Sequence, residues 1–71
     1  MTELGLYLTK KSTNKAEISR KTGISAPRLS ELTLNVGSHL RAKELYLIAL
    51  AIDVDPCEIL KEVCGHLKLE Q

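Results

Sequence analysis

The segment from Asn14 to Leu34 constrains the fold most strongly, because it contains the boundary signals of two short helices. Asn14 is a predicted N-cap whose side chain accepts a hydrogen bond from a free backbone amide, and Glu17 stands at the capping-box position three residues later. A glycine adopts the left-handed backbone of a helix C-terminus without a Cβ penalty, and Gly23 is the residue of this kind in the segment. The sequence therefore predicts a first helix that begins at Lys15 and ends at Gly23.

The second helix of this pair is predicted from Ala26 to Leu34. Ser25 is its N-cap, and Pro27 falls in the first turn, where a missing amide hydrogen breaks no intrahelical bond. At about 100° per residue, two aliphatic side chains point to one side and the polar and small ones to the other. The inner side carries Leu29 and Leu32, and the outer side carries Pro27, Ser30, Glu31 and Leu34, with Ala26 and Arg28 at its edges. These few apolar residues cannot stabilise the helix pair alone, so other helices must cover its inner face. The outer face remains free for a partner.

Three further helices are predicted from apolar residues at helical spacing. The first runs from Glu3 to Lys11 and has an apolar face of Leu4, Tyr7 and Leu8. The second runs from Ala42 to Ile52 and has an apolar face that includes Leu45, Ile48 and Ala49. The third starts at Asp55-Pro56, ends at Gly65 and buries Ile59, Leu60 and Val63. Tyr46 and Leu47 are expected in the core, with a second contact surface as the alternative. The sequence thus predicts an all-α, compact five-helix domain over residues 1–65.

Residues 66–71 alternate apolar and polar side chains, and we expect a frayed terminus there, with a short strand or a partner-pairing arm as the alternatives. The longest nearly apolar run, Leu45 to Ile52, is far shorter than the ~20 residues of a membrane span. The first residues lack the charged and apolar pattern of a signal peptide. We therefore expect a cytoplasmic protein with no membrane partner.

The sequence contains no arrangement typical of an active site or a metal site. It has no glycine-rich phosphate loop, no histidine near a plausible nucleophile and no paired carboxylates in a predicted cleft. Cys57 and Cys64 lie about 10 Å apart along one predicted helix, which is too far for a disulfide, and their spacing with His66 fits no zinc module. We expect free, buried thiols, no enzyme activity, no metal and no cofactor.

The charges are divided unevenly along the chain, although the net charge is only +1. Residues 1–43 hold eight Lys or Arg against three Glu, whereas residues 44–71 hold two Lys against six Asp or Glu. A basic half that contains the helix pair is the distribution expected when one face binds phosphate. Ordinary solvated surface charge is the alternative explanation.

The helix pair resembles the helix-turn-helix of the Xre family, the phage-repressor-like DNA-binding domains. The matching positions are Lys15, Ser19, Gly23, Ile24, Ser25, Leu29 and Leu32. Downstream, Glu44 to Val54 and Glu58 to Leu60 are similar to the family's fourth and fifth helices, so the resemblance covers roughly residues 4–63. Family members often carry an arginine where this chain has Leu8, and the ion pair of that arginine is expected to be absent here.

The resemblance implies that the helix from Ala26 to Leu34 enters the major groove of double-stranded DNA. It implies base contacts from Ala26, Pro27, Arg28, Ser30 and Glu31, and phosphate contacts from Asn14, Lys15, Ser38, His39, Arg41 and Lys43. Arg28 is expected on guanine or on a phosphate. Glu31 accepts from cytosine N4 or pairs with a neighbouring cation, and an exposed loop histidine is the alternative for His39.

Few of these side chains can form hydrogen bonds to bases, so we expect weak discrimination by one domain and a homodimer on two half-sites. The dimer is expected to form through the last helix, the tail, or Tyr46 and Leu47. The sequence therefore indicates a small transcriptional regulator, most simply a repressor. The alternative is an antitoxin or adaptor that acts mainly through a protein partner.

Overall fold

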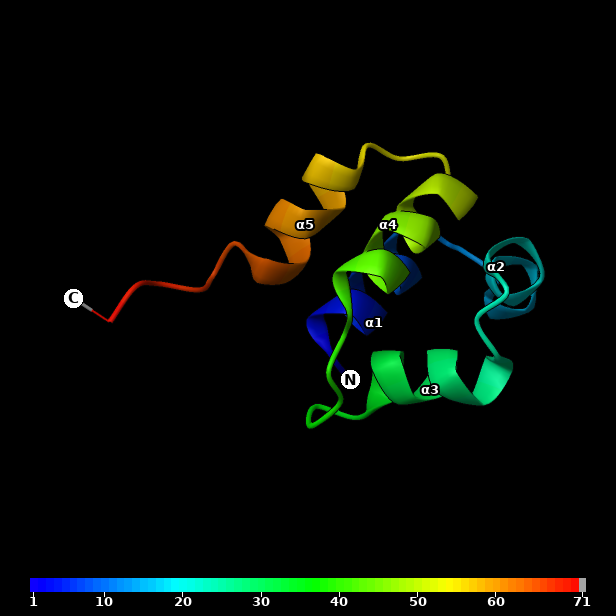
Figure 1. Ribbon diagram of the computed structural model, residues 1–71, viewed down its shortest axis with the longest axis horizontal. Helices are drawn as coiled ribbons and strands as arrows, with labels where there is room; N and C mark the ends of the chain where they lie inside the picture. The colour runs from blue at the N-terminus through cyan, green and yellow to red at the C-terminus, as the bar shows by residue number, and fades with distance from the viewer. Residues whose placement is uncertain (71) are drawn as a thin grey trace.

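The computed structural model describes residues 1–70 and contains five α-helices and no strand within that range (Figure 1). The helices are α1 (Glu3–Lys10), α2 (Lys15–Thr22), α3 (Ala26–Leu34), α4 (Ala42–Ala51) and α5 (Pro56–Cys64). The predicted all-α five-helix fold is confirmed. Figure 1 shows α3 along the lower edge of the molecule and α5 toward the upper edge, with the C-terminal tail running away from the other helices.

The boundary signals of α2 and α3 act as the sequence predicts. The Asn14 side-chain oxygen accepts hydrogen bonds from the amides of Ala16, at 2.8 Å, and Glu17, at 3.3 Å. Gly23 has a φ of 81°, so it occupies the left-handed region that an L-residue with a Cβ rarely adopts. The Ser25 hydroxyl accepts from the Arg28 amide at 3.2 Å and caps α3.

Some boundary details differ from the predictions. Glu17 does not act as a capping-box partner, because its carboxylate pairs with Arg20 one turn along α2. Asp55 occupies the N-cap position of α5, but its side chain makes no capping hydrogen bond. The helices α1 and α4 each end one residue earlier than expected. Residues 65–70 form neither helix nor strand, and Gln71 of the predicted tail lies outside the described residues.

One apolar cluster holds the five helices together. Its members are Leu4, Tyr7, Leu8, Ile18, Leu29, Leu32, Leu45, Ile48, Ala49 and Ile59. Leu8 is a buried aliphatic member of this cluster, 4% exposed. The expectation that Tyr46 is a core residue is wrong, because it is 55% exposed, and Leu60 at 48% also faces outward. Leu47 is half-buried, because α4 packs on α2 and α5 but does not have neighbours on every side.

The C-terminal end of α3 is held against the start of α1 by two hydrogen bonds from Thr2. The Thr2 amide donates to the Thr33 carbonyl at 2.9 Å, and the Thr2 hydroxyl donates to the Leu32 carbonyl at 2.7 Å. These contacts satisfy two carbonyls that a helix end leaves without intrahelical partners. The approach is close because Gly5 has no side chain: a Cβ there would lie 2.3 Å from the Thr33 carbonyl oxygen.

On the opposite side, α1 is joined to α5 by a polar contact. The Tyr7 hydroxyl donates to a Glu58 carboxylate oxygen at 2.9 Å, and the Lys11 ammonium lies 3.9 Å from the same oxygen. Burial, together with the hydrogen bond to Glu58, raises the pKa of the Tyr7 phenol to about 12. None of the helices within residues 1–70 has the length and apolarity needed to cross a bilayer.

We expect Gly5→Ala to lower the free energy of unfolding by about 1–3 kcal/mol, because the added methyl group overlaps a backbone carbonyl that cannot rotate away. Urea denaturation followed by circular dichroism measures this change. Gly37→Ala is the matched control, since its Cβ would meet only the Asn35 side chain, at 3.3 Å. Equal stability of the two variants would contradict a steric requirement at Gly5.

Candidate nucleic-acid interface

The outer face of α3 is exposed and is mostly small or apolar. Ala26, Pro27, Glu31 and Leu34 are exposed, whereas Ser30 is half-buried. The inward leucines, Leu29 and Leu32, are in the core. The structure therefore orients α3 as the helical wheel predicts, with an outer face that no other described segment covers.

Arg28 behaves differently from its neighbours on α3, because its guanidinium folds back onto the protein. Its Nε donates to one carboxylate oxygen of Glu44 at 2.8 Å, and its Nη2 donates to the other at 3.0 Å. Nη2 also donates to the backbone carbonyl of His39 at 2.8 Å, and Nη1 pairs with the Glu31 carboxylate. Arg28 thus joins α3 to the following loop and to the first turn of α4.

Glu44 is the acceptor at the centre of this arrangement. One of its oxygens also accepts from the Arg41 amide at 3.0 Å, which is half of a capping box at the start of α4. The hydrogen bonds from Arg28 hold the pKa of the Glu44 carboxyl below its usual range, and burial opposes this effect. The same pairing, with Glu44 first and Glu31 second, raises the pKa of the Arg28 guanidinium.

Sequence reasoning did not identify Glu44 as part of the candidate interface. The available signal is the spacing from Arg41 to Glu44, which is that of an N-cap and its N3 glutamate. Arginine is not a usual N-cap residue, so this spacing was not informative on its own. The pairing of Glu44 with Arg28, sixteen residues earlier, depends on how the helices pack and has no local signal.

The loop between α3 and α4 is stabilised by its own hydrogen bonds. The Asn35 side-chain oxygen accepts from the Gly37 amide at 2.9 Å, and its backbone carbonyl accepts from the Ser38 hydroxyl at 2.7 Å. Ser38 is therefore partly used within the loop, whereas His39 and Arg41 are exposed. The loop is ordered by contacts that leave its basic side chains free.

Two hollows flank the C-terminal half of α3. On one side, Lys15 and Leu34 line a small hollow of about 80 Å³ next to α1. On the other side is a polar hollow of about 400 Å³, lined by Arg28, Glu31, Asn35, Gly37, Ser38, His39 and Arg41. The structure thus brings the predicted loop residues together with Glu31 and Arg28, and it places Lys15 across α3 from them.

Three of the predicted phosphate-binding cations are exposed without an ion-pair partner among residues 1–70: Lys15, Arg41 and Lys43. Arg28 differs, because its charge is compensated by two carboxylates. Asn14, next to Lys15, is exposed and uses its side-chain oxygen in capping, so its amide N–H groups remain available as donors. The positive charge around α3 therefore comes from its neighbours and not from α3 itself.

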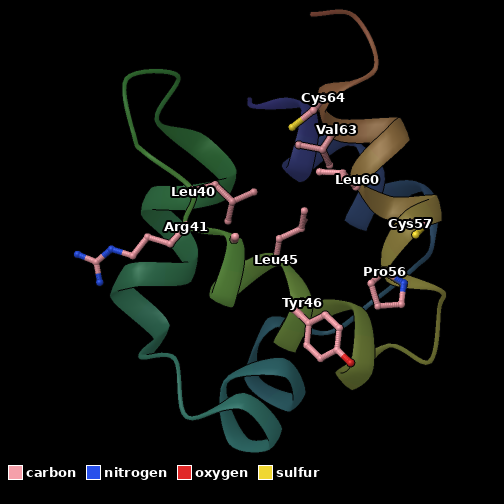
Figure 2. A pocket seen from close by; sticks show the side chains of 10 residues that line it. Leu40, Arg41, Leu45, Tyr46, Pro56, Cys57, Leu60, Val63 and Cys64 are labelled. Carbon is pink, nitrogen blue, oxygen red and sulfur yellow. The ribbon is translucent and has the colours of Figure 1, made fainter.

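A second exposed surface is the apolar groove between α4 and α5 (Figure 2). Its volume is about 530 Å³, and it is lined by Leu40, Arg41, Ala42, Leu45, Tyr46, Pro56, Cys57, Leu60, Val63 and Cys64. Figure 2 shows the guanidinium of Arg41 pointing away from the groove, whose wall is otherwise aliphatic, aromatic or sulfur-containing. This groove is unlike the polar hollow beside α3.

Both cysteines line this groove as free thiols. The expectation that the thiols are buried is wrong, since Cys57 is exposed and Cys64 is half-buried. The reason is that α5 contacts α1 and α4 only, so one side of it remains open. Within residues 1–70, no three His, Cys, Asp or Glu side chains are grouped closely enough to hold a metal ion.

The ion pair of Glu44 predicts a loss of stability in acid. The pKa of Glu44 is lowered in the folded chain and returns to its ordinary value of about 4.3 on unfolding. The stabilisation is therefore complete above the ordinary value and is lost as the pH falls toward the folded-state value. We expect the wild type to lose more stability than Glu44→Gln between about pH 5 and pH 3.

Urea denaturation at a series of pH values measures this difference. Glu70→Gln, in the exposed tail, is the matched control and is expected to follow the wild type. A Glu44→Gln profile parallel to that of the wild type would contradict the stabilising role of the ionised carboxylate.

Comparisons with known proteins add no assignment. No family model, no curated protein and no solved structure matches this chain.

Proposed function

We propose that this chain is a cytoplasmic, sequence-specific, double-stranded DNA-binding protein of the Xre type that acts as a small transcriptional regulator, most simply a repressor. The observation that carries the proposal is the exposed outer face of α3, flanked by Lys15 on one side and by His39 and Arg41 on the other. A protruding helix between cations suits a major groove between two phosphate backbones.

In this proposal α3 enters the major groove with its N-terminus first. Ala26 and Pro27 offer apolar surface, which is most useful against a thymine methyl group. Ser30 supplies an adaptable hydroxyl, and the Glu31 carboxylate accepts a hydrogen bond from cytosine N4. The low number of hydrogen-bonding groups means that base contacts contribute little discrimination per domain.

Phosphate contacts supply most of the affinity. Lys15 and the side-chain amide of Asn14 bind the backbone on one side of the groove, together with the positive end of the α2 dipole. Ser38, His39, Arg41 and Lys43 bind the backbone on the other side. Of the acidic residues in the second half of the chain, only Glu44 is paired with α3, through Arg28. The others lie between α4 and α5, on α5 and in the tail.

We further propose that a homodimer supplies the selectivity that one domain lacks, because two half-sites multiply weak preferences. The α4–α5 groove is the dimer contact in this proposal, since it is apolar and Tyr46 and Leu60 beside it are about half exposed. A second copy presents the same aliphatic surface, which is the requirement for an isologous contact.

The second candidate function is an antitoxin or adaptor that binds a different protein. The same groove favours it, and so do Leu67 and Leu69 in the tail, which are 66% and 88% exposed. In this alternative, DNA binding is secondary or lost. A wild-type chain that binds no DNA would therefore favour this second candidate.

Selection of bound duplexes from a random pool, followed by affinity measurements at several salt concentrations, tests the DNA proposal. We expect Lys15→Ala and Arg41→Ala to weaken binding to all sequences alike and to reduce the salt slope by about one unit each. Lys61→Ala is the matched control, because Lys61 is an exposed cation on α5, and its salt slope should equal that of the wild type. Absence of any complex at low salt would reject the DNA proposal in favour of the protein-binding alternative.

Sedimentation velocity with and without DNA tests the dimer contact. We expect Leu60→Glu to abolish self-association, because it places a charge in the apolar groove. Leu6→Glu is the matched control, since Leu6 is similarly exposed, at 52%, on α1 and does not line the groove. Unchanged self-association of Leu60→Glu, or loss in both variants, would contradict this assignment.

A further inference from the structure

Arg28 has almost no hydrogen-bonding capacity left for DNA. A guanidinium has five N–H donors. Four of them are used: two on the Glu44 carboxylate, one on the His39 carbonyl and one on the Glu31 carboxylate. Specific contact with guanine uses two donors on O6 and N7, whereas Arg28 has a single free N–H, on Nη1.

The position of the acceptors explains what these bonds accomplish. They belong to three separate segments: α3 itself, the following loop and the first turn of α4. Within the described chain, the backbones of α3 and α4 each lie close to α2 but not to one another. The Arg28 side chain therefore bridges α3 to the loop that carries His39 and Arg41 and to the first turn of α4.

Moving Arg28 toward DNA would be unfavourable, because it would leave two carboxylates without their cation beside the phosphates. The Glu44 side chain is only 12% exposed, so water compensates it poorly once Arg28 leaves. Glu31 is on the outer face of α3, where an uncompensated negative charge repels DNA. Arg28 therefore lowers the repulsion between Glu31 and phosphate when it stays in place.

We propose that Arg28 is a positioning residue, which holds the loop of His39 and Arg41 against α3 and orients the Glu31 carboxylate toward a base, without contacting DNA itself. This inference depends on the proposed DNA-binding function and assigns the roles within that interface. Glu44 is its partner in the same role. Its carboxylate bridges Arg28 to the backbone amide that starts α4.

The proposal predicts that a substitution of Glu44 changes the base preference in the same way as a substitution of Arg28. Arg28→Lys keeps the positive charge but removes the planar guanidinium, which donates hydrogen bonds to several acceptors at once. Glu44→Gln removes the ionised acceptor while leaving the Arg28 side chain intact. We expect both variants to weaken the preference at the base next to Glu31 by about five- to tenfold, the low end of the range for one good base contact.

The double variant separates a shared role from two independent ones. If Arg28 and Glu44 act as one unit, Arg28→Lys with Glu44→Gln should lower the preference no further than either single variant. Glu31→Gln should change the preferred base at the same position from cytosine toward adenine, because glutamine pairs with adenine N6 and N7. Selection of duplexes from a random pool gives these preferences, and thermal unfolding gives the folded fraction of each variant.

Amide hydrogen exchange in the absence of DNA provides a second readout. We expect faster exchange at residues 38–41 in both Arg28→Lys and Glu44→Gln, with the amides of α1 and α5 unchanged. Arg20→Lys is the matched control, because Arg20 forms an exposed ion pair within α2 and contacts no loop. It should change neither the exchange nor the base preference.

The outcomes distinguish this inference from the function on which it depends. If Arg28→Lys changes the base preference at a duplex position where Glu44→Gln has no effect, Arg28 contacts a base. The inference is then rejected, while the DNA-binding proposal stands. If Glu44→Gln tightens binding because it releases Arg28, the inference is also rejected. If the wild type binds no duplex, the DNA-binding proposal itself fails.

Discussion

The ion pair between Arg28 and Glu44 is the interaction on which the candidate interface depends. The apolar core holds α3 through two inward leucines, Leu29 and Leu32. Polar contacts hold the helix near both of its ends. Arg28 connects the first half of α3 to the loop and to α4, while Thr2 caps the last carbonyls of α3 at the other end.

This arrangement divides the charges between two tasks. The one positive charge of Arg28 is paired with the two negative charges of Glu31 and Glu44, so α3 carries no unpaired cation. Lys15, Arg41 and Lys43 have no carboxylate partner among residues 1–70. Lys15 and Arg41 line the hollows on the two sides of α3. In the proposed complex, the surrounding cations supply affinity for any duplex, and the weakly polar helix supplies modest selectivity.

The molecule also has two surfaces of opposite character. The hollow beside α3 is polar, whereas the groove between α4 and α5 is apolar and contains both cysteines. An open apolar groove lowers the stability of a chain of 71 residues, because a small domain buries little apolar surface in its core. An apolar partner surface compensates this cost in the proposed dimer and equally in the protein-binding alternative.

Local chemistry made most of the fold predictable. The boundaries of α2 and α3 follow from Asn14, Gly23 and Ser25, because capping and left-handed backbone depend on residues that are adjacent in sequence. The outward position of Glu31 on α3 follows from helical periodicity. The same reasoning failed for Tyr46 and Leu60, since periodicity predicts which side chains share a face but not whether another element covers that face.

The sequence by itself determined that the chain is all-α, where α2 and α3 begin and end, and which side chains lie on the outer face of α3. Only the tertiary structure decided that Arg28 turns inward to Glu44, that Thr2 caps α3 beside Gly5, and that the α4–α5 face stays open. The physical reason is the range of the interactions. Capping and periodicity act within one or two turns, whereas these contacts join residues that are brought together only when the core packs.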